Sequence, residues 1–218
     1  MSQAAAVTTA TSLTAPTLPP TAEVAPAARQ GYALELYFDP ALENQVLKAW
    51  NALARRQIST KLIEIESRPH ITLLSAPSLD PARLLSAVRS LASRLEPFPV
   101  SLSSIASFPQ SSSPSPSSGG GVLFLAPTPT SALLGLHTQL CEVLKKEGIE
   151  AAEEYQPDSW VPNCPVAVDV PRGRIGEAFC LLRDLKLPVC GYAMDIGLVE
   201  FSPVREIFSF PIGGDAEA

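Results

Sequence analysis

Two side chains suited to chemistry on a phosphate group stand two residues apart in the segment Arg68-Pro69-His70-Ile71-Thr72-Leu73-Leu74. The pattern predicts a strand, in which residues two apart point to the same face, so His70 and Thr72 should project together into a cleft. An imidazole can transfer a proton near neutral pH, and a hydroxyl can donate to a phosphoryl oxygen. The alternative is a strand histidine with a purely structural role.

A later segment, Trp160-Val161-Pro162-Asn163-Cys164-Pro165-Val166, matches the first in register. Pro162 aligns with Pro69, so Asn163 falls at the position of His70 and Pro165 at the position of Thr72. An asparagine amide can donate to a phosphate oxygen but cannot exchange a proton at a useful pH. Proline has no hydroxyl and no backbone N–H. The second segment thus keeps the spacing of the first without its chemistry.

Other side chains near these segments have two interpretations each. Trp160 and Tyr155 are candidates for stacking on a base, or are aromatic residues that pack at the entrance of a strand. His137 lies among leucines at helical spacing and is expected to line the helix seam. Cys164 alternates away from the expected cleft, which argues against a nucleophilic thiol.

The elements that must position these residues alternate in type along the chain. Strands are expected near residues 32–38, 65–74, 100–108, 122–125, 161–170, 193–201 and 206–211, and helices near 40–53, 80–95, 130–147 and 175–185. This order repeats a unit of strand, helix and hairpin. It predicts an α+β fold with two pseudo-duplicated halves.

The domain organisation follows from composition. Residues 1–30 are rich in Ala, Thr and Pro and are expected to form a disordered tail, with an organelle transit peptide as the alternative. Residues 31–212 should form a single domain, in which the Ser/Pro/Gly tract 109–121 is a hairpin loop rather than an interdomain linker. Residues 213–218 read as a loose tail.

The overall charge and composition exclude several classes of protein. A formal net charge of −6 argues against coating of DNA or RNA. With four cysteines, no CxxC pair and two histidines, a structural zinc site is not expected. No apolar run is long enough for a membrane span, and no secretory signal is recognisable. We therefore expect a monomeric protein of the cytoplasm, or of a plastid if the tail is a transit peptide.

Four pieces of the sequence, in this order and spacing, resemble the 2H phosphoesterase superfamily, which includes RNA 2′,3′-cyclic phosphodiesterases and 2′–5′ RNA ligase-like proteins. They are Pro69-His70-Ile71-Thr72-Leu73, the hairpin Phe108-Pro109 … Val122-Leu123-Phe124-Leu125-Ala126-Pro127, Trp160-Val161-Pro162-Asn163, and Leu198-Val199-Glu200-Phe201 … Val204-Arg205-Glu206-Ile207. The resemblance covers the chain from Tyr32 to Ile212. It implies two pseudo-symmetric lobes whose antiparallel sheets flank a central cleft, with helices on the outside.

The resemblance also implies a function. Each lobe of the family offers a His-x-Thr/Ser motif, and neither a metal nor a cofactor is needed. His70 and Thr72 would be catalytic, whereas Asn163 and Trp160 would bind substrate. Because losing one of two proton-transfer groups costs on the order of 10²–10⁴ in rate, weakened hydrolysis of a 2′,3′-cyclic phosphate on a nucleotide or RNA terminus is expected. The alternative is a non-catalytic pseudoenzyme that binds nucleotides or RNA ends.

Overall fold

The computed structural model describes residues 31–108, 121–201 and 204–214. The strands are β1 (Tyr32–Phe38), β2 (His70–Ala76), β3 (Phe98–Phe108), β4 (Gly121–Pro127), β5 (Cys164–Val170), β6 (Val189–Glu200) and β7 (Arg205–Pro211). The α-helices are α1 (Pro40–Arg55), α2 (Lys61–Glu64), α3 (Pro81–Ser93), α4 (Ser131–Lys146) and α5 (Ile175–Arg183), and two 3-10 helices cover η1 (Glu153–Tyr155) and η2 (Arg172–Arg174). This mixture of helices and antiparallel strands confirms the predicted α+β class.

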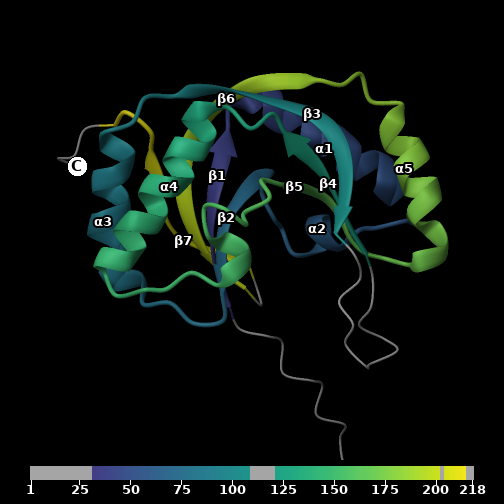
Figure 1. The fold of residues 1–218 in the computed structure, drawn as a ribbon. Helices are drawn as coiled ribbons and strands as arrows, with labels where there is room; N and C mark the ends of the chain where they lie inside the picture. Colours follow the sequence, from purple (N-terminus) through teal and green to yellow (C-terminus); the bar gives the residue numbers. More distant parts are fainter. Residues whose placement is uncertain (1–30, 109–120, 202–203, 215–218) are drawn as a thin grey trace, which may run out of the picture.

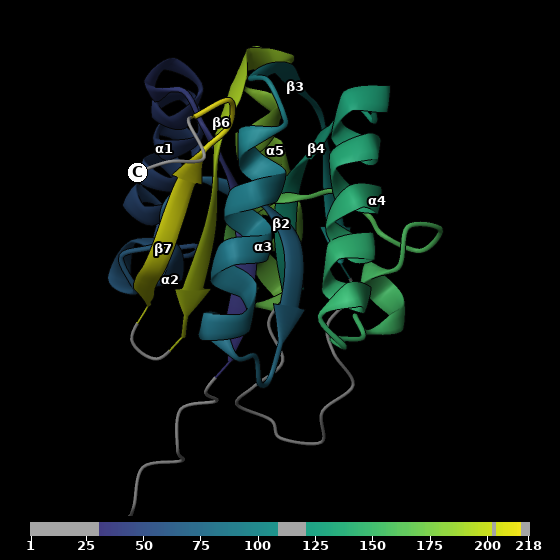
Figure 2. The ribbon, with the colours of Figure 1, turned by 90° about the vertical axis from the view of Figure 1, so that its left-hand side faces the viewer.

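One antiparallel sheet joins both halves of the fold through the long strand β6. The strand order is β2-β1-β6-β3-β4-β5, with β7 also paired to β6. Residues 193–200 of β6 pair with β1, whereas residues 189–193 pair with β3. We call β2, β1, β7 and the end of β6 the first lobe, and β3, β4, β5 and the start of β6 the second lobe. Helices α3 and α4 lie on one side of the molecule and α1 and α5 on the other (Figures 1 and 2).

Local signals set the starts of the long helices. Asp39 caps α1, because its carboxylate accepts from the N–H groups of Ala41 and Leu42 at 2.8 and 3.0 Å. The Thr130 hydroxyl accepts from Leu133 at the start of α4. Each helix turns its apolar stripe to the sheet, and the leucines and valines of these stripes form the buried core.

Two of the predicted strands begin later than expected, and both differences concern the site. Residues 61–64 form α2, and Glu66 has a positive φ of 56°, so β2 starts at His70 rather than near residue 65. In the second half, β5 starts at Cys164 rather than Val161. His70 is thus the first residue of its strand, and Asn163 immediately precedes the other.

Strands β3 and β4 pair antiparallel, as the predicted hairpin requires. The tract at 109–120, the tail at 1–30 and residues 215–218 lie outside the described residues, so the expectations for them stay predictions. Within the described part of the chain, no helix is long and apolar enough to cross a membrane.

Candidate functional site

The two aligned segments meet in space, although 90 or so residues separate them in the sequence. The backbone N–H of Thr72 donates to the carbonyl of Asn163 at 3.2 Å, which joins β2 of the first lobe to the start of β5 in the second. Trp50 on α1 donates from Nε1 to the carbonyl of Pro165 at 3.1 Å and so anchors the second segment. The two segments that were aligned in the sequence therefore lie side by side at the junction between the lobes, and their equivalence stays a prediction.

A pocket of about 460 Å³ opens at this junction. It is lined by residues of both lobes and of the segment that leads into β5, namely Thr72, Phe108, Glu154, Tyr155, Ser159, Trp160, Val161 and Asn163. Four of the five residues that the sequence analysis named as candidates for catalysis or substrate contact thus line one pocket, namely Thr72, Tyr155, Trp160 and Asn163. His70 is not among its lining residues.

Thr72 and Asn163 present hydrogen-bond donors to the pocket. The Thr72 side chain is half-buried, and its hydroxyl has no hydrogen bond to another described residue. Asn163 is 9% exposed, and its Nδ2 donates one proton to the carbonyl of Val161 at 2.9 Å. Because a side-chain amide carries two donors, the second one remains for a ligand. Both side chains suit an acceptor such as a phosphate oxygen.

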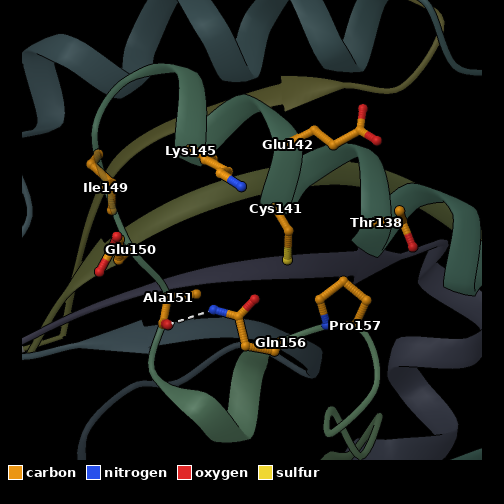
Figure 3. Close-up of a pocket in the computed structure, with 9 residues that line it drawn as sticks. All are labelled: Thr138, Cys141, Glu142, Lys145, Ile149, Glu150, Ala151, Gln156 and Pro157. Carbon is orange, nitrogen blue, oxygen red and sulfur yellow. Dashed lines mark hydrogen bonds between the residues drawn. The ribbon is translucent and has the colours of Figure 1, made fainter.

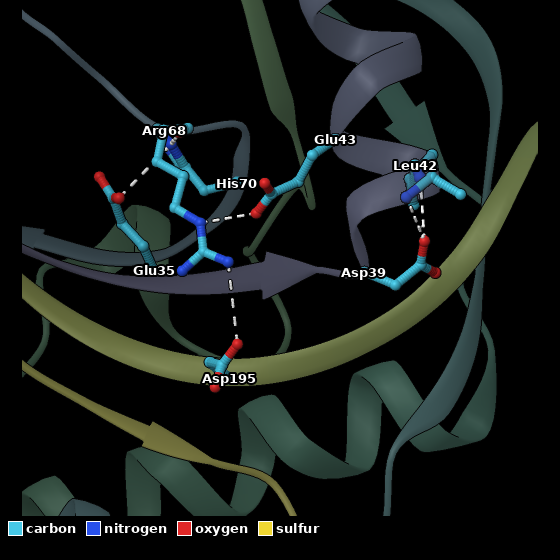
Figure 4. A network of polar contacts seen from close by, with 8 residues as sticks. Glu35, Asp39, Leu42, Glu43, Arg68, His70 and Asp195 are labelled. Carbon is cyan, nitrogen blue, oxygen red and sulfur yellow. Dashed lines mark hydrogen bonds and ion pairs between the residues drawn. The ribbon is translucent and has the colours of Figure 1, made fainter.

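His70 is held in one orientation. Its Nδ1 lies 2.7 Å from the carbonyl oxygen of Arg68, which can only accept, so Nδ1 carries the proton (Figure 4). Nε2 is then the nitrogen that can take up or release a proton. The imidazole is buried, with 6% of the residue exposed.

Glu35 is a site residue that the sequence reasoning missed. Its Oε2 lies 3.4 Å from Nδ1 of His70, and the residue is 3% exposed. Burial raises the pKa of the Glu35 carboxyl, while the His70 imidazole and a hydrogen bond from Tyr37 oppose that rise. In β1, Glu35 and Tyr37 alternate with the core leucines, and they pair with Thr72 and His70 in register. That alternation was the available signal.

Arg68 completes this polar group but is occupied by other partners. Its Nε lies 2.6 Å from Glu43 and its Nη2 lies 3.8 Å from Asp195 (Figure 4). Its guanidinium carbon also lies 4.2 Å from the ring centroid of Tyr37. The arginine charge beside the first motif is therefore balanced by carboxylates of the chain itself.

Trp160 and His137 support the backbone of β2. Trp160 donates from Nε1 to the carbonyl of Thr72 at 3.1 Å. The Nε2 atom of His137 lies 3.2 Å from the carbonyl oxygen of Leu73. The two rings stack with centroids 3.8 Å apart. Burial lowers the pKa of His137 to about 4, so it is neutral at pH 7 and donates to Leu73. His137 has a packing role, and Trp160, which lines the pocket, is only 7% exposed.

The second motif lies in an apolar setting. Pro165 pairs in register with Phe124, whose ring stacks on Phe108 at 4.4 Å. Cys164 is completely buried, and burial raises the pKa of its thiol well above the ordinary range, which makes it unreactive. Among the described residues, no group of three His, Cys, Asp or Glu side chains is placed to hold a metal ion.

A second cavity, of about 510 Å³, lies between α4 and the segment that follows it (Figure 3). Its lining includes Cys141, Lys145 and Gln156 but no residue of either motif. The Sγ of Cys141 donates to the carbonyl of Tyr155 at 3.5 Å, so this cavity and the motif pocket share one connecting segment.

A family model for the 2′-5′ RNA ligase superfamily matches residues 38–202, which is more than half of the chain and includes both motifs. The chain belongs to the 2′-5′ RNA ligase superfamily. The resemblance to the 2H phosphoesterases is therefore confirmed. No curated protein sequence matches the chain.

Two solved structures are similar to the chain at low sequence identity. LigT of Escherichia coli in complex with 3′-AMP is 12% identical, with a TM-score of 0.52, and the match covers 86% of this chain and all of LigT. Usb1 of Kluyveromyces marxianus with uridine monophosphate is 14% identical, with a TM-score of 0.44, over 84% of this chain and 98% of Usb1. The likeness to LigT shows that the two proteins share the arrangement of helices and strands.

Proposed function

We propose that the chain binds a nucleotide that ends in a 2′,3′-cyclic phosphate or a related phosphate, and that it hydrolyses the cyclic phosphate slowly. The observation that carries this proposal is the hydrogen bond between Thr72 and Asn163, because it holds both motifs against one pocket. The fold shared with LigT, which was solved with 3′-AMP, supports a nucleotide as the ligand.

Each residue has a distinct part in this reaction. The Thr72 hydroxyl and the Asn163 amide donate to phosphate oxygens. The phosphate is seated so that Nε2 of His70 takes a proton from a water molecule, whose oxygen forms the new bond to phosphorus. The bond to one ribose oxygen breaks, and solvent protonates that oxygen in place of the absent second histidine. No metal or cofactor takes part.

A second candidate is a protein that binds the same ligand without turnover. Two observations favour it: His70 is 6% exposed and does not line the pocket, and neither Asn163 nor Pro165 can transfer a proton. The two candidates share the binding site and differ only in whether His70 reaches the water.

The experiment is to incubate the purified chain with 2′,3′-cyclic AMP, to identify the product by chromatography, and to measure binding of 3′-AMP by calorimetry. Thr72→Val removes the hydroxyl at constant shape, and Thr72→Ser restores it as the matched control. We expect slow formation of a single monophosphate, with binding weakened about tenfold in the valine variant alone, as for a lost hydrogen bond to a charged group. Binding that depends on Thr72 without turnover selects the second candidate. Binding that is equal in all three proteins contradicts both.

A further inference from the structure

The environment of the single motif histidine contains a feature that the proposed reaction does not use. Glu35, on the neighbouring strand β1, is 3% exposed and places Oε2 3.4 Å from Nδ1 of His70. The main-chain carbonyl of Arg68 already accepts from the same nitrogen at 2.7 Å. The carboxyl is therefore not needed to fix the tautomer, and its role must be sought in its charge.

A buried carboxylate that lacks a nearby cation is strongly destabilised, because little water reaches it. Burial indeed raises the pKa of Glu35, and the Tyr37 hydroxyl, which hydrogen-bonds to the carboxylate, counteracts this rise. In such a setting the attraction between Glu35 and a positive imidazole is stronger than at an exposed surface. The attraction between Glu35 and His70 is therefore strongest when His70 is protonated. The Tyr37 hydroxyl supports this pair through its hydrogen bond to Glu35.

We propose that Glu35 is a positioning residue for His70: it lies against the Nδ1–H edge of the ring, which the Arg68 carbonyl fixes, and supplies the negative charge that stabilises the imidazolium ion. When Nε2 takes the proton of the attacking water, Nδ1 keeps its own proton and Glu35 stays a carboxylate. The effect on turnover rests on the proposed function, whereas the effect on proton binding by His70 does not.

The other charged groups around this pair are few and identifiable. Arg68 faces both side chains but is held by Glu43 of α1 and Asp195 of β6. Glu206 of β7 acts on Glu35 as a like charge. On the side of β5, the neighbour is the buried thiol of Cys164, which accepts from the backbone N–H of His70.

The test is a titration of the full chain, labelled with ¹⁵N at its two histidines, followed by NMR from pH 4 to 9. In Glu35→Gln we expect His70 to bind its proton about tenfold more weakly than in the wild type, because an opposite charge at this distance is lost. The His137 signal in the same spectra serves as the internal reference. Glu206→Gln is the matched control, in which an exposed carboxylate is removed and the change stays below about twofold.

Tyr37→Phe keeps the proposal testable if Glu35→Gln does not fold. Loss of the hydroxyl removes a hydrogen bond that lowers the pKa of Glu35 and so favours its negative charge, and His70 should therefore bind its proton about threefold more weakly. Where the wild type turns over 2′,3′-cyclic AMP, Glu35→Gln lowers kcat about tenfold and leaves KM within about twofold. A His70 titration in Glu35→Gln that matches Glu206→Gln overturns the proposal, whether or not turnover is seen.

Discussion

The two lobes present contrasting faces to the junction at which their motifs meet. In the first lobe, β1 and β2 place Glu35, Tyr37, His70 and Thr72 on one face. In the second lobe, the corresponding positions hold Pro165 against Phe124 and Phe108. The only described histidine in either motif therefore lies in the first lobe, whereas the aligned position of the second motif holds the amide of Asn163. The two motif segments thus lie side by side in the fold but differ in the side chains that they offer.

The largest expected effect comes from removing the proton-transfer group of the first lobe. His70→Gln keeps a side chain that can donate to the Arg68 carbonyl but cannot exchange a proton. Turnover of 2′,3′-cyclic AMP should fall by about 10³, in the range of general acid–base catalysis. Thermal unfolding monitors whether the variant is folded. A folded variant with wild-type turnover would show that the first lobe is not the active half.

The buried ring of His137, which stacks on Trp160, predicts that the stability of the fold depends on pH. Because burial lowers the pKa of His137 from 6.5 to about 4, the unfolded chain binds a proton more readily than the folded one between these values. Stability due to this group is therefore complete above pH 6.5 and is lost as the pH falls towards 4. The loss amounts to about 3 kcal/mol.

His137→Gln tests this, because it keeps a donor for the Leu73 carbonyl and removes the titration. Urea unfolding at pH 7.5 and pH 4.5 should show that the difference in unfolding free energy between the wild type and the variant shrinks at low pH. Glu35 contributes to both proteins alike, so it does not obscure the comparison. A difference that is independent of pH would mean that His137 binds its proton equally well in the folded and the unfolded chain.

How much the sequence predicted differs between the lobes for physical reasons. Strand β1 and the helices with clear caps, such as α1 after Asp39, were predicted within a few residues, because apolar periodicity and capping are local. Strand β2 was predicted too early, because residues 61–64 form α2 and Glu66 has a positive φ, which delays the strand until His70. Glu35 was missed because the alternation in β1 is typical of a strand with one exposed polar face, whereas pairing with β2 and β6 buries Glu35 beside His70.

Restoring the second motif should reduce the contrast between the lobes. The double change Asn163→His and Pro165→Thr supplies the absent imidazole and hydroxyl at the junction. We expect turnover to rise at least about tenfold over the wild type, the lower end of what one acid–base group contributes. Asn163→Gln with Pro165→Thr is the control, which has similar size and no imidazole. Equal rates in the two double variants would mean that the second lobe no longer aligns with the phosphate.

The smallest expected effect concerns the indole hydrogen bond that supports the first motif. Trp160→Phe keeps an aromatic ring for the stack on His137 but leaves the Thr72 carbonyl without its Nε1 donor. We expect a loss of about 1 kcal/mol in unfolding free energy, measured with urea, and little change in nucleotide affinity. A large loss of affinity at unchanged stability would instead give Trp160 a direct contact with the ligand.

The most direct test of the central claim is a crystal structure of the chain with bound 3′-AMP. The account predicts a phosphate within hydrogen-bond distance of Thr72 Oγ1 and Asn163 Nδ2, in the pocket that both lobes line. A phosphate bound instead beside Lys145, in the cavity along α4, would contradict it.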